Sequence, residues 1–191
     1  MFDKYNKMFI FDTETSALSP DPYGEIIELG GILLTKPKGS NKFSKRKDIS
    51  VLIQNKYPIL NSHIHNITQD MCRKDGITKE ELFKTLKPIF GKHDDILIVA
   101  YNTPFDMKFV RAFMENMKPG YEITNPTLDI LEVAKDRTGL RRGNKLCDML
   151  VRYNITNAQN SHRALDDVEA TLEVMRKMWS ENPNLETYIK E

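Results

Sequence analysis

The chain has 191 residues, of which 40% are hydrophobic and 29% are charged, values typical of a single globular domain. Its 28 Lys and Arg residues nearly balance its 27 Asp and Glu residues. The resulting net charge of +1 excludes a strongly basic nucleic-acid coat and an acidic tail. Local patches of either sign remain compatible with this balance.

Membrane insertion, secretion and a cysteine framework are all disfavoured. The longest apolar run covers residues 96–101, far fewer than the roughly 20 residues that span a bilayer. Asp12 and Glu14 follow the N-terminus too soon for a signal peptide. The two cysteines form no CxxC pair, which fits a reducing compartment. We therefore expect a cytoplasmic protein without a membrane segment, forming one domain over residues 1–191 with its core over about residues 8–180.

The first part of the chain predicts strands. Residues 8–11 form a short apolar run that stops at a polar segment, which is typical of a buried strand. Residues 25–34 are apolar and β-branched, and Gly30-Gly31 within them allows a bulge. Residues 49–53 return as a partner strand. The connection over residues 36–47 is predicted to be an exposed basic loop.

The rest of the chain predicts helices and one further strand. Thr78-Lys79-Glu80-Glu81 is a capping box that begins a helix ending near residue 90. Residues 96–100 form a buried strand, and Thr103-Pro104 begins a helix that ends near residue 117. Further helices are predicted over residues 128–136, 145–153 and 163–179. This order predicts an α/β fold in which helices flank a mixed sheet and polar groups gather at the strand ends.

Two carboxylates lie where the first predicted strand ends. Asp12 and Glu14 are two residues apart, so on a strand both side chains point to one face of the sheet. Two like charges so close repel each other unless a cation lies between them. The pair therefore indicates a cation site, and a polar turn after a strand is the alternative interpretation.

A third carboxylate follows the next strand along the chain. Asp106 falls in the first turn of the helix that begins at Thr103. An acid in that position stabilises the helix dipole, and this alone explains many such residues. The functional alternative is a third carboxylate at a neighbouring strand end.

The last predicted helix supplies a fourth carboxylate and a histidine. Its buried stripe is indicated by apolar residues three and four positions apart, namely Leu165, Val168, Leu172, Met175 and Trp179. Asp166 lies opposite that stripe and is expected in solvent. Asp167 lies on its flank, where a carboxylate needs a partner or a metal ion. His162 is expected in the loop that enters the helix.

Four carboxylates with a nearby histidine indicate metal-dependent hydrolysis. Carboxylate oxygens suit Mg²⁺ or Mn²⁺ rather than zinc. Two such ions about 3.5–4 Å apart hold a phosphate, activate a water molecule and stabilise the leaving oxygen. An imidazole with an ordinary pKa of about 6.5 can take the proton from that water.

These residues form motifs that resemble those of the DEDDh family of 3′→5′ exonucleases, the group of the proofreading epsilon subunit of bacterial DNA polymerase III. The main motifs are Phe11-Asp12-Thr13-Glu14-Thr15, Asn102-Thr103-Pro104-Phe105-Asp106 and His162-Arg163-Ala164-Leu165-Asp166-Asp167. Two weaker matches are His65-Asn66-Ile67-Thr68 and Asn144-Lys145-Leu146-Cys147-Asp148-Met149-Leu150. The motifs occur in family order along nearly the whole chain.

The resemblance implies an RNase H-like exonuclease fold and two divalent cations, Mg²⁺ or Mn²⁺. By position, Asp12 would contact both ions, and Glu14 and Asp167 would complete the site of the ion that activates water. Asp106 would hold the second ion, and His162 would be the general base. The residues implied in contacts with the substrate are Thr13, Thr15, Leu18, His65, Asn102 and Phe105.

The implied activity is stepwise release of nucleoside 5′-monophosphates from single-stranded or frayed DNA 3′ ends. Proofreading in DNA replication, with a DNA polymerase as partner, and DNA repair are the implied settings. The chain departs from the family pattern at Tyr101, Asn66 and Ser16-Ala17, in segments expected to face the substrate. It also shows no evident C-terminal tail for attachment to a polymerase.

Two alternatives to a DNA exonuclease stay open. The first is an exoribonuclease of the same family that trims RNA 3′ ends, since two metal ions do not distinguish the sugars. The second is a nucleic-acid-binding module without catalysis. All five catalytic positions are filled, which disfavours the second alternative.

Two clusters of basic residues are candidates for phosphate contacts. The first comprises Lys36, Lys38, Lys42, Lys45, Arg46 and Lys47, and the second comprises Arg137, Arg141, Arg142 and Lys145. A solvated surface is the favoured interpretation of the first cluster. The second lies closer in sequence to the helix with the fourth carboxylate and is expected to meet phosphates.

Overall fold

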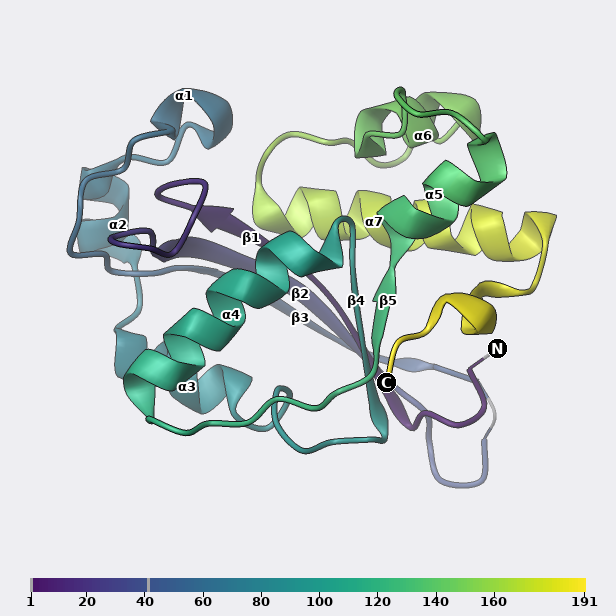
Figure 1. Cartoon of the computed structure of the whole chain (residues 1–191), viewed down its shortest axis with the longest axis horizontal. Helices are drawn as coiled ribbons and strands as arrows, with labels where there is room; N and C mark the ends of the chain where they lie inside the picture. The colour runs from purple at the N-terminus through teal and green to yellow at the C-terminus, as the bar shows by residue number, and fades with distance from the viewer. Residues whose placement is uncertain (1, 41) are drawn as a thin grey trace.

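The computed structural model describes residues 2–40 and 42–191, except for the side chain of Lys45. Within this part of the chain, helices cover both faces of a central sheet (Figure 1). The strands are β1 (Lys7–Thr15), β2 (Ile26–Thr35), β3 (Lys45–Leu52), β4 (Ile96–Ala100) and β5 (Thr127–Asp129). The helices are α1 (Ser62–His65), α2 (Gln69–Asp75), α3 (Lys79–Leu86), α4 (Thr103–Met117), α5 (Ile130–Thr138), α6 (Leu146–Arg152), α7 (Ala164–Glu181) and a 3₁₀ helix (Leu185–Tyr188).

The described strands form one mixed sheet in the order β3-β2-β1-β4-β5. β1, β2 and β3 pair in antiparallel fashion, whereas β4 and β5 continue the sheet in parallel. β4 pairs with β1 only from Lys7 to Ile10, so residues 11–15 of β1 extend past this pairing. The end of β1 is therefore open on that side to side chains from other elements.

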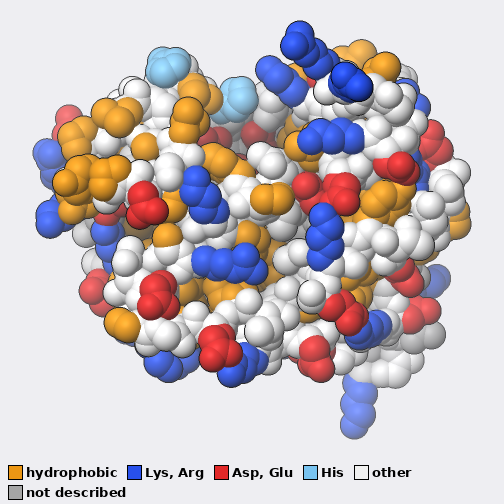
Figure 2. Space-filling view, in the orientation of Figure 1, with side chains coloured by type: hydrophobic (Ala, Val, Ile, Leu, Met, Phe, Trp, Pro, Cys, Tyr) orange, Lys and Arg blue, Asp and Glu red, His pale blue; other side chains and the backbone are white. Residues whose placement is uncertain are grey.

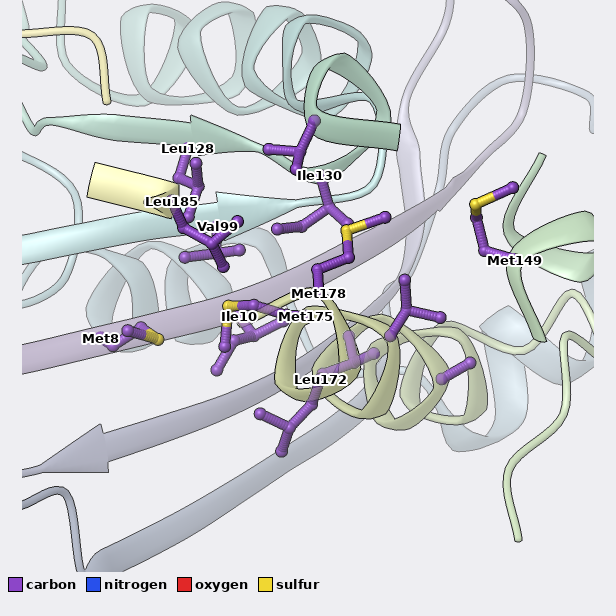
Figure 3. Close-up of a cluster of buried hydrophobic side chains, with 14 of the residues drawn as sticks. Met8, Ile10, Val99, Leu128, Ile130, Met149, Leu172, Met175, Met178 and Leu185 are labelled. Atoms are coloured by element: carbon purple, nitrogen blue, oxygen red, sulfur yellow. The ribbon is translucent and has the colours of Figure 1, made fainter. Parts of the chain in front are cut away.

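Side chains alternate along β1 and give each face of the sheet its own apolar core. Met8 and Ile10 point towards α5, α6 and α7. They pack there among buried side chains that include Val99, Leu172 and Met175 (Figure 3). The apolar stripe predicted for the last helix is thus the surface that attaches α7 to the sheet.

The opposite face of the sheet carries the second core, which lies under α3 and α4. Phe9 and Phe11 point into it and both make edge-on ring contacts with Phe90. Because the alternation continues along β1, Asp12 and Glu14 emerge on the α7 face. The expected α/β architecture, a mixed sheet between helices, is confirmed.

The glycine pair of β2 serves close packing and forms no bulge. Pairing with β1 is continuous at Gly30-Gly31, and the register shifts instead between Glu14 and Thr15. A Cβ atom on Gly30 would lie 2.3 Å from the carbonyl carbon of Ala164 in α7, and one on Gly31 would lie 2.4 Å from the ring of Phe9. The bulge prediction was wrong because both glycines make room for neighbours above and below the sheet.

Local sequence signals located the helices α3 and α4. The helix predicted from Thr103-Pro104 is α4, which ends at Met117 as expected. Its N-cap is Asn102 rather than the predicted Thr103, whose hydroxyl donates to the carbonyls of Ala100 and Leu128. The capping box of α3 is confirmed, because Thr78 and Glu81 each bond the other's backbone N–H. The helix ends at Leu86, earlier than predicted.

The helix predicted over residues 128–136 was wrong at its start. Residues 127–129 form β5, and Leu128 is fully buried in the sheet. α5 begins at Ile130, where the Asp129 carboxylate caps it by accepting the Leu131 N–H at 3.1 Å. One apolar run is shared by a very short strand and a helix, so its periodicity shows no boundary between them.

Three further differences concern short or paired segments. β3 begins at Lys45, so Lys45–Lys47 belong to a strand rather than to the predicted loop, because β2 pairs with it as far as Thr35. α1 and α2 were not predicted. They have 4 and 7 residues, too few for a readable helical period.

Two expected absences concern membrane spans and disulfides. No helix in the described residues is both long and apolar enough to cross a bilayer. Cys72 and Cys147 are both free thiols, as expected from their spacing.

Candidate active site

Carboxylates from three elements meet where β1 extends past β4. Asp12 and Glu14 come from β1, Asp106 from the first turn of α4, and Asp167 from the first turn of α7. The four lie close enough that the charges of the other three all act on Asp12. The acids that the sequence placed far apart along the chain are therefore brought into one cluster.

Asp106 is held against the open edge of β1 by Thr13. The Thr13 N–H and hydroxyl both donate to Asp106 Oδ1, at 2.9 Å and 2.7 Å. This N–H can bond a side chain because the pairing of β4 with β1 ends at Ile10. Burial raises the pKa of Asp106 to about 7, although the bonds from Thr13 oppose the rise. Asp106 therefore connects α4 to β1 and also presents a carboxylate to the cluster.

The loop that enters α7 folds around Asp167. Asn160 Nδ2 and the Ser161 N–H donate to its two carboxylate oxygens at 2.5 Å and 3.1 Å. His162 has a φ of 56°, which turns the chain sharply into the helix. Its ring lies beside Glu14 and Asp167, and one ligand atom from each of the three residues lies within 4.8 Å of the others.

Burial and mutual repulsion hold protons on the carboxyls of this cluster. Burial raises the pKa of Glu14 to about 8, and the charges of Asp167 and Glu28 add to the rise. Burial, followed by the charge of Asp106, raises the pKa of Asp12 well above its usual range. Burial also raises the pKa of Asp167. Burial and repulsion thus disfavour the charged form of these carboxyls, and nearby positive charge would stabilise it. A divalent cation would supply that charge.

The cluster forms the floor of a cleft of about 670 Å³. All five predicted catalytic residues line it, together with Thr13, Asn102, Phe105, Lys135, Arg141, Arg142 and Lys145. Figure 2 shows recessed acidic side chains beside a histidine, with Lys and Arg side chains gathered above them at the upper right. An acidic floor beneath a basic rim suits a cation-assisted reaction on a phosphodiester.

The other three predicted substrate contacts do not line this cleft. Thr15 is buried, and its hydroxyl donates to the Ala17 carbonyl at 2.7 Å. His65 is 1% exposed, and its Nδ1 accepts the Ile67 N–H at 3.1 Å. Leu18 is 75% exposed on the loop after β1. Leu18 is thus accessible from solvent, whereas Thr15 and His65 each bond a backbone group two residues further along the chain.

The second basic cluster divides into two groups. Arg141, Arg142 and Lys145 line the cleft, as predicted for phosphate contacts. The Arg137 side chain is buried and donates to the Asn182 carbonyl at 2.6 Å, so it attaches the chain after α7 to α5. The inclusion of Arg137 in a phosphate-binding patch was therefore wrong.

The first basic cluster contains structural contacts. Lys36 Nζ donates to the Phe2 carbonyl at 2.7 Å and is largely buried. Arg46 Nε is paired with Asp48 Oδ1 at 2.6 Å, and its guanidinium is also paired with Glu169. The side chain of Lys45 lies outside the described residues. Lys36 and Arg46 thus have intramolecular partners and are not simply solvated.

Sequence reasoning missed two polar residues beside the cluster. Glu28 lies opposite Glu14 on β2 and is 2% exposed. An acid in an otherwise apolar strand was the available signal, because buried acids need partners. Asn160, which bonds Asp167, lies in a polar loop without a distinguishing pattern.

Comparisons with known sequences find one matching family and several similar proteins. A profile of the family described as Exonuclease (RNase T) matches residues 9–175. The DNA polymerase III PolC-type proteins of Bacillus cereus and Thermotoga maritima are 32% and 30% identical over 173 and 165 residues. These matches cover 88% and 86% of this chain. The chain spans only 11% of the length of either relative.

Solved structures with the same fold are also nucleases. The E. coli ExoI–ssDNA complex has a TM-score of 0.77 and 20% identity, covering 96% of this chain and 42% of that chain. The nuclease domain of 3′hExo, a DEDDh family member bound to rAMP, has a TM-score of 0.73 and 18% identity. That match covers 98% of this chain and 97% of the other.

Proposed function

The chain belongs to the exonuclease family, and from this premise we propose that it is a metal-dependent 3′→5′ exonuclease that releases nucleoside 5′-monophosphates from DNA. The expected RNase H-like exonuclease fold is confirmed by the similarity to ExoI and 3′hExo. The observation that carries the proposal is the clustering of four carboxylates and a histidine at the floor of the cleft. There Glu14, His162 and Asp167 bring ligand atoms within 4.8 Å of one another, beside Asp12 and Asp106.

The donor set of the cleft fits divalent cations that prefer oxygen ligands. Carboxylates predominate, and burial, to which the charges of neighbouring carboxylates add, raises the pKa of Asp12 and of Glu14. We assign Asp12, Glu14, Asp106 and Asp167 as the residues that would hold two Mg²⁺ or Mn²⁺ ions. When bound, such ions supply activation of water and stabilisation of the charge on the transferred phosphate.

His162 is suited to accept the proton of the attacking water. It is exposed and lines the cleft, and its loop is anchored to Asp167 through Asn160 and Ser161. An imidazole exchanges protons readily near neutral pH. Asn102 and Phe105 line the same cleft and would orient the terminal nucleotide, with Leu18 placed against its base.

DNA is the proposed substrate because the sequence relatives are named as DNA polymerases and ExoI was solved with single-stranded DNA. On the same ground, a DNA polymerase is the proposed partner and proofreading the proposed setting. RNA is the second candidate because 3′hExo was solved with rAMP. The cations at the rim would contact phosphates, which both polymers share.

A degradation assay tests the activity. We expect the protein to release mononucleotides from a 3′-labelled single-stranded oligonucleotide with Mg²⁺ or Mn²⁺, and EDTA to stop the release. Asp12→Ala should lower the rate by more than about 100-fold, because losing a ligand costs more than losing its supporting contacts. Asp70→Asn, at an exposed site on α2, is the matched control and should retain the wild-type rate.

The same assay separates the candidate functions. A higher kcat/KM on DNA than on a matched RNA oligonucleotide supports the DNA enzyme, and the reverse supports the exoribonuclease. Absence of mononucleotide release, or release that survives Asp12→Ala, would refute both. Salt-sensitive binding without cleavage would support the module that lacks catalysis.

A further inference from the structure

Glu28 is a buried carboxylate that the proposed reaction does not use, although it lies beside the reacting groups. It is paired with Glu14 in the register of β1 and β2, so both side chains occupy the sheet face that α7 covers. The residue is 2% exposed. A carboxylate removed from water in this way needs a complete set of bonding partners.

Arg163, the residue that follows His162, supplies most of these partners. Its guanidinium donates to Glu28 Oε1 at 2.6 Å and 3.0 Å, and to Oε2 at 3.2 Å. The Ala164 N–H donates to Glu28 Oε2 at 2.9 Å. This N–H belongs to the first turn of α7, where backbone donors have no acceptor within the helix. Glu28 therefore caps α7 from a neighbouring strand.

Gly30 brings the same turn of α7 into direct contact with β2. A Cβ atom at Gly30 would lie 2.3 Å from the carbonyl carbon of Ala164 and 2.4 Å from the nitrogen of Leu165. The backbone of α7 thus rests on the backbone of β2 two residues from Glu28. Together, this contact and the bonds of Glu28 fix the position and orientation of the first turn of α7, which carries Asp167.

We propose that Glu28 and Arg163 form a positioning pair that sets His162 and Asp167 at their working distance from Glu14. The inference rests on the proposed exonuclease function. His162 holds a left-handed backbone conformation, with a φ of 56°. A residue other than glycine keeps such a conformation only where its neighbours fix it, and the bonds of the adjacent Arg163 do so.

Two other roles for the pair are disfavoured by the contacts. Glu28 is not a fifth metal ligand, because both of its oxygens are taken by Arg163 and Ala164. The Arg163 side chain is 46% exposed, but its guanidinium bonds Glu28 and is absent from the described lining of the cleft. Both residues therefore act on the reaction through His162 and Asp167 and are not themselves catalytic.

Steady-state kinetics of Glu28→Gln, Arg163→Met and the double variant test the proposal. We expect each single variant to lower kcat by about 10- to 100-fold with little change in KM, because misplacing a catalytic group slows the chemical step. The double variant should be no slower than the slower single variant, because the two residues act as a unit. Arg163→Lys, which keeps the charge, should recover part of the loss.

Calorimetric titration with Mn²⁺ alone gives a second measurement that does not depend on turnover. We expect both single variants to bind Mn²⁺ about tenfold more weakly than the wild type, because Asp167 is displaced. A wild type that releases no mononucleotide refutes the exonuclease, whereas unchanged Mn²⁺ affinity in the variants refutes the pair. A wild type that binds no Mn²⁺ overturns both.

Arg46→Met is the matched control. It also removes an arginine that connects the sheet to α7, through Glu169, but away from His162. We expect wild-type kcat and Mn²⁺ affinity in this variant. Equal losses in Arg46→Met and Arg163→Met would show general loosening of α7 and overturn the proposal. Unchanged kcat in both Glu28→Gln and Arg163→Met would also overturn the proposal. So would a rise in KM without a fall in kcat in Arg163→Met, or losses of kcat that add up in the double variant.

Discussion

Glu14 and Asp106 keep their protons to unusually high pH because the fold removes water from them. Burial raises the pKa of Glu14 to about 8 and that of Asp106 to about 7. Asp167 shows the same direction of shift for the same reason. Its neighbour Asp166, which was expected in solvent, is half-buried and accepts a hydrogen bond from the Ser161 hydroxyl at 2.5 Å, outside the described lining of the cleft.

These raised pKa values predict how stability depends on pH. In EDTA, the free energy of unfolding should fall as pH rises from about 5 to 8, because the folded state holds protons that the unfolded state has released. The stabilisation is complete below the unfolded pKa and is lost as pH passes the raised pKa of Glu14, about 8. Urea unfolding at a series of pH values measures the slope.

Glu14→Gln should flatten that slope, since the amide does not titrate. Glu80→Gln, at an exposed site in the first turn of α3, should follow the wild type. Added Mg²⁺ should stabilise the wild type most at the high end of the range, because binding then displaces fewer protons. A slope that is the same in wild type and Glu14→Gln would contradict the assignment.

The role of His162 as proton acceptor gives a further prediction. If it accepts the proton of the attacking water, His162→Ala should lower kcat by about 10²- to 10⁴-fold. The pH dependence of the rate should differ between wild type and His162→Ala, because the variant lacks the proton acceptor. His63→Ala, an exposed histidine of α1, is the control. Parallel pH profiles for wild type and His162→Ala would exclude the role.

The site depends on the different lengths of β1 and β4. β1 extends past β4, so the first turn of α4 can bond the open edge of β1 through Asp106 and Thr13. On the other face, Gly30 lets the first turn of α7 rest on β2. Two helix starts, one above and one below the sheet, thus deliver carboxylates to the same strand end. Both acids lie in the first turn of a helix, where the helix dipole favours a negative charge.

Substitution of the two adjacent glycines separates the packing of α7 from general stability. Gly30→Ala should lower the free energy of unfolding by about 1–3 kcal/mol, because its Cβ meets backbone that cannot move independently. It should also lower kcat, since α7 shifts. Gly31→Ala pushes instead against the ring of Phe9 on the opposite face and should lower stability while keeping kcat. Denaturant unfolding and kinetics well below the midpoint measure both, and equal effects on kcat would contradict the prediction.

The whole molecule is nearly neutral, but acidic and basic side chains lie in separate parts of its cleft. The net charge of +1 hides an acidic floor and a rim that carries Arg141 and Arg142. Figure 2 shows hydrophobic side chains gathered at the upper left, on the other side of the opening from the Lys and Arg side chains. Leu18, in the loop after β1, and Leu60 are both 75% exposed. Phosphates and bases of a single strand would therefore meet different sides of the opening.

The basic rim predicts a salt-dependent KM. Arg141→Gln and Arg142→Gln should each raise KM for an oligonucleotide, leave kcat unchanged and reduce the slope of log KM against log salt by about 1. Arg111→Gln removes the same charge from an exposed site on α4 and should leave the slope unchanged. Equal slopes in all four proteins would show that the rim does not contact phosphates.

The sequence by itself determined what depends on neighbours along the chain. Spacing placed Asp12 and Glu14 on one face, put Asp167 on the flank of a helix, and located α4. It did not distinguish β5 from α5, because a strand of three residues has no readable period. Such short elements are selected by their pairing with β4, which the local pattern does not contain.

Only the tertiary structure decided which distant residues meet. Thr13 with Asp106, and Glu28 with Arg163, are 93 and 135 residues apart. The raised pKa of Glu14 exists only once water has been excluded and other acids face it. Arg137, predicted at the phosphate site, turned inward because backbone carbonyls after α7 needed a donor. Local periodicity is encoded in short stretches of chain, whereas burial and partner choice are properties of the packed whole.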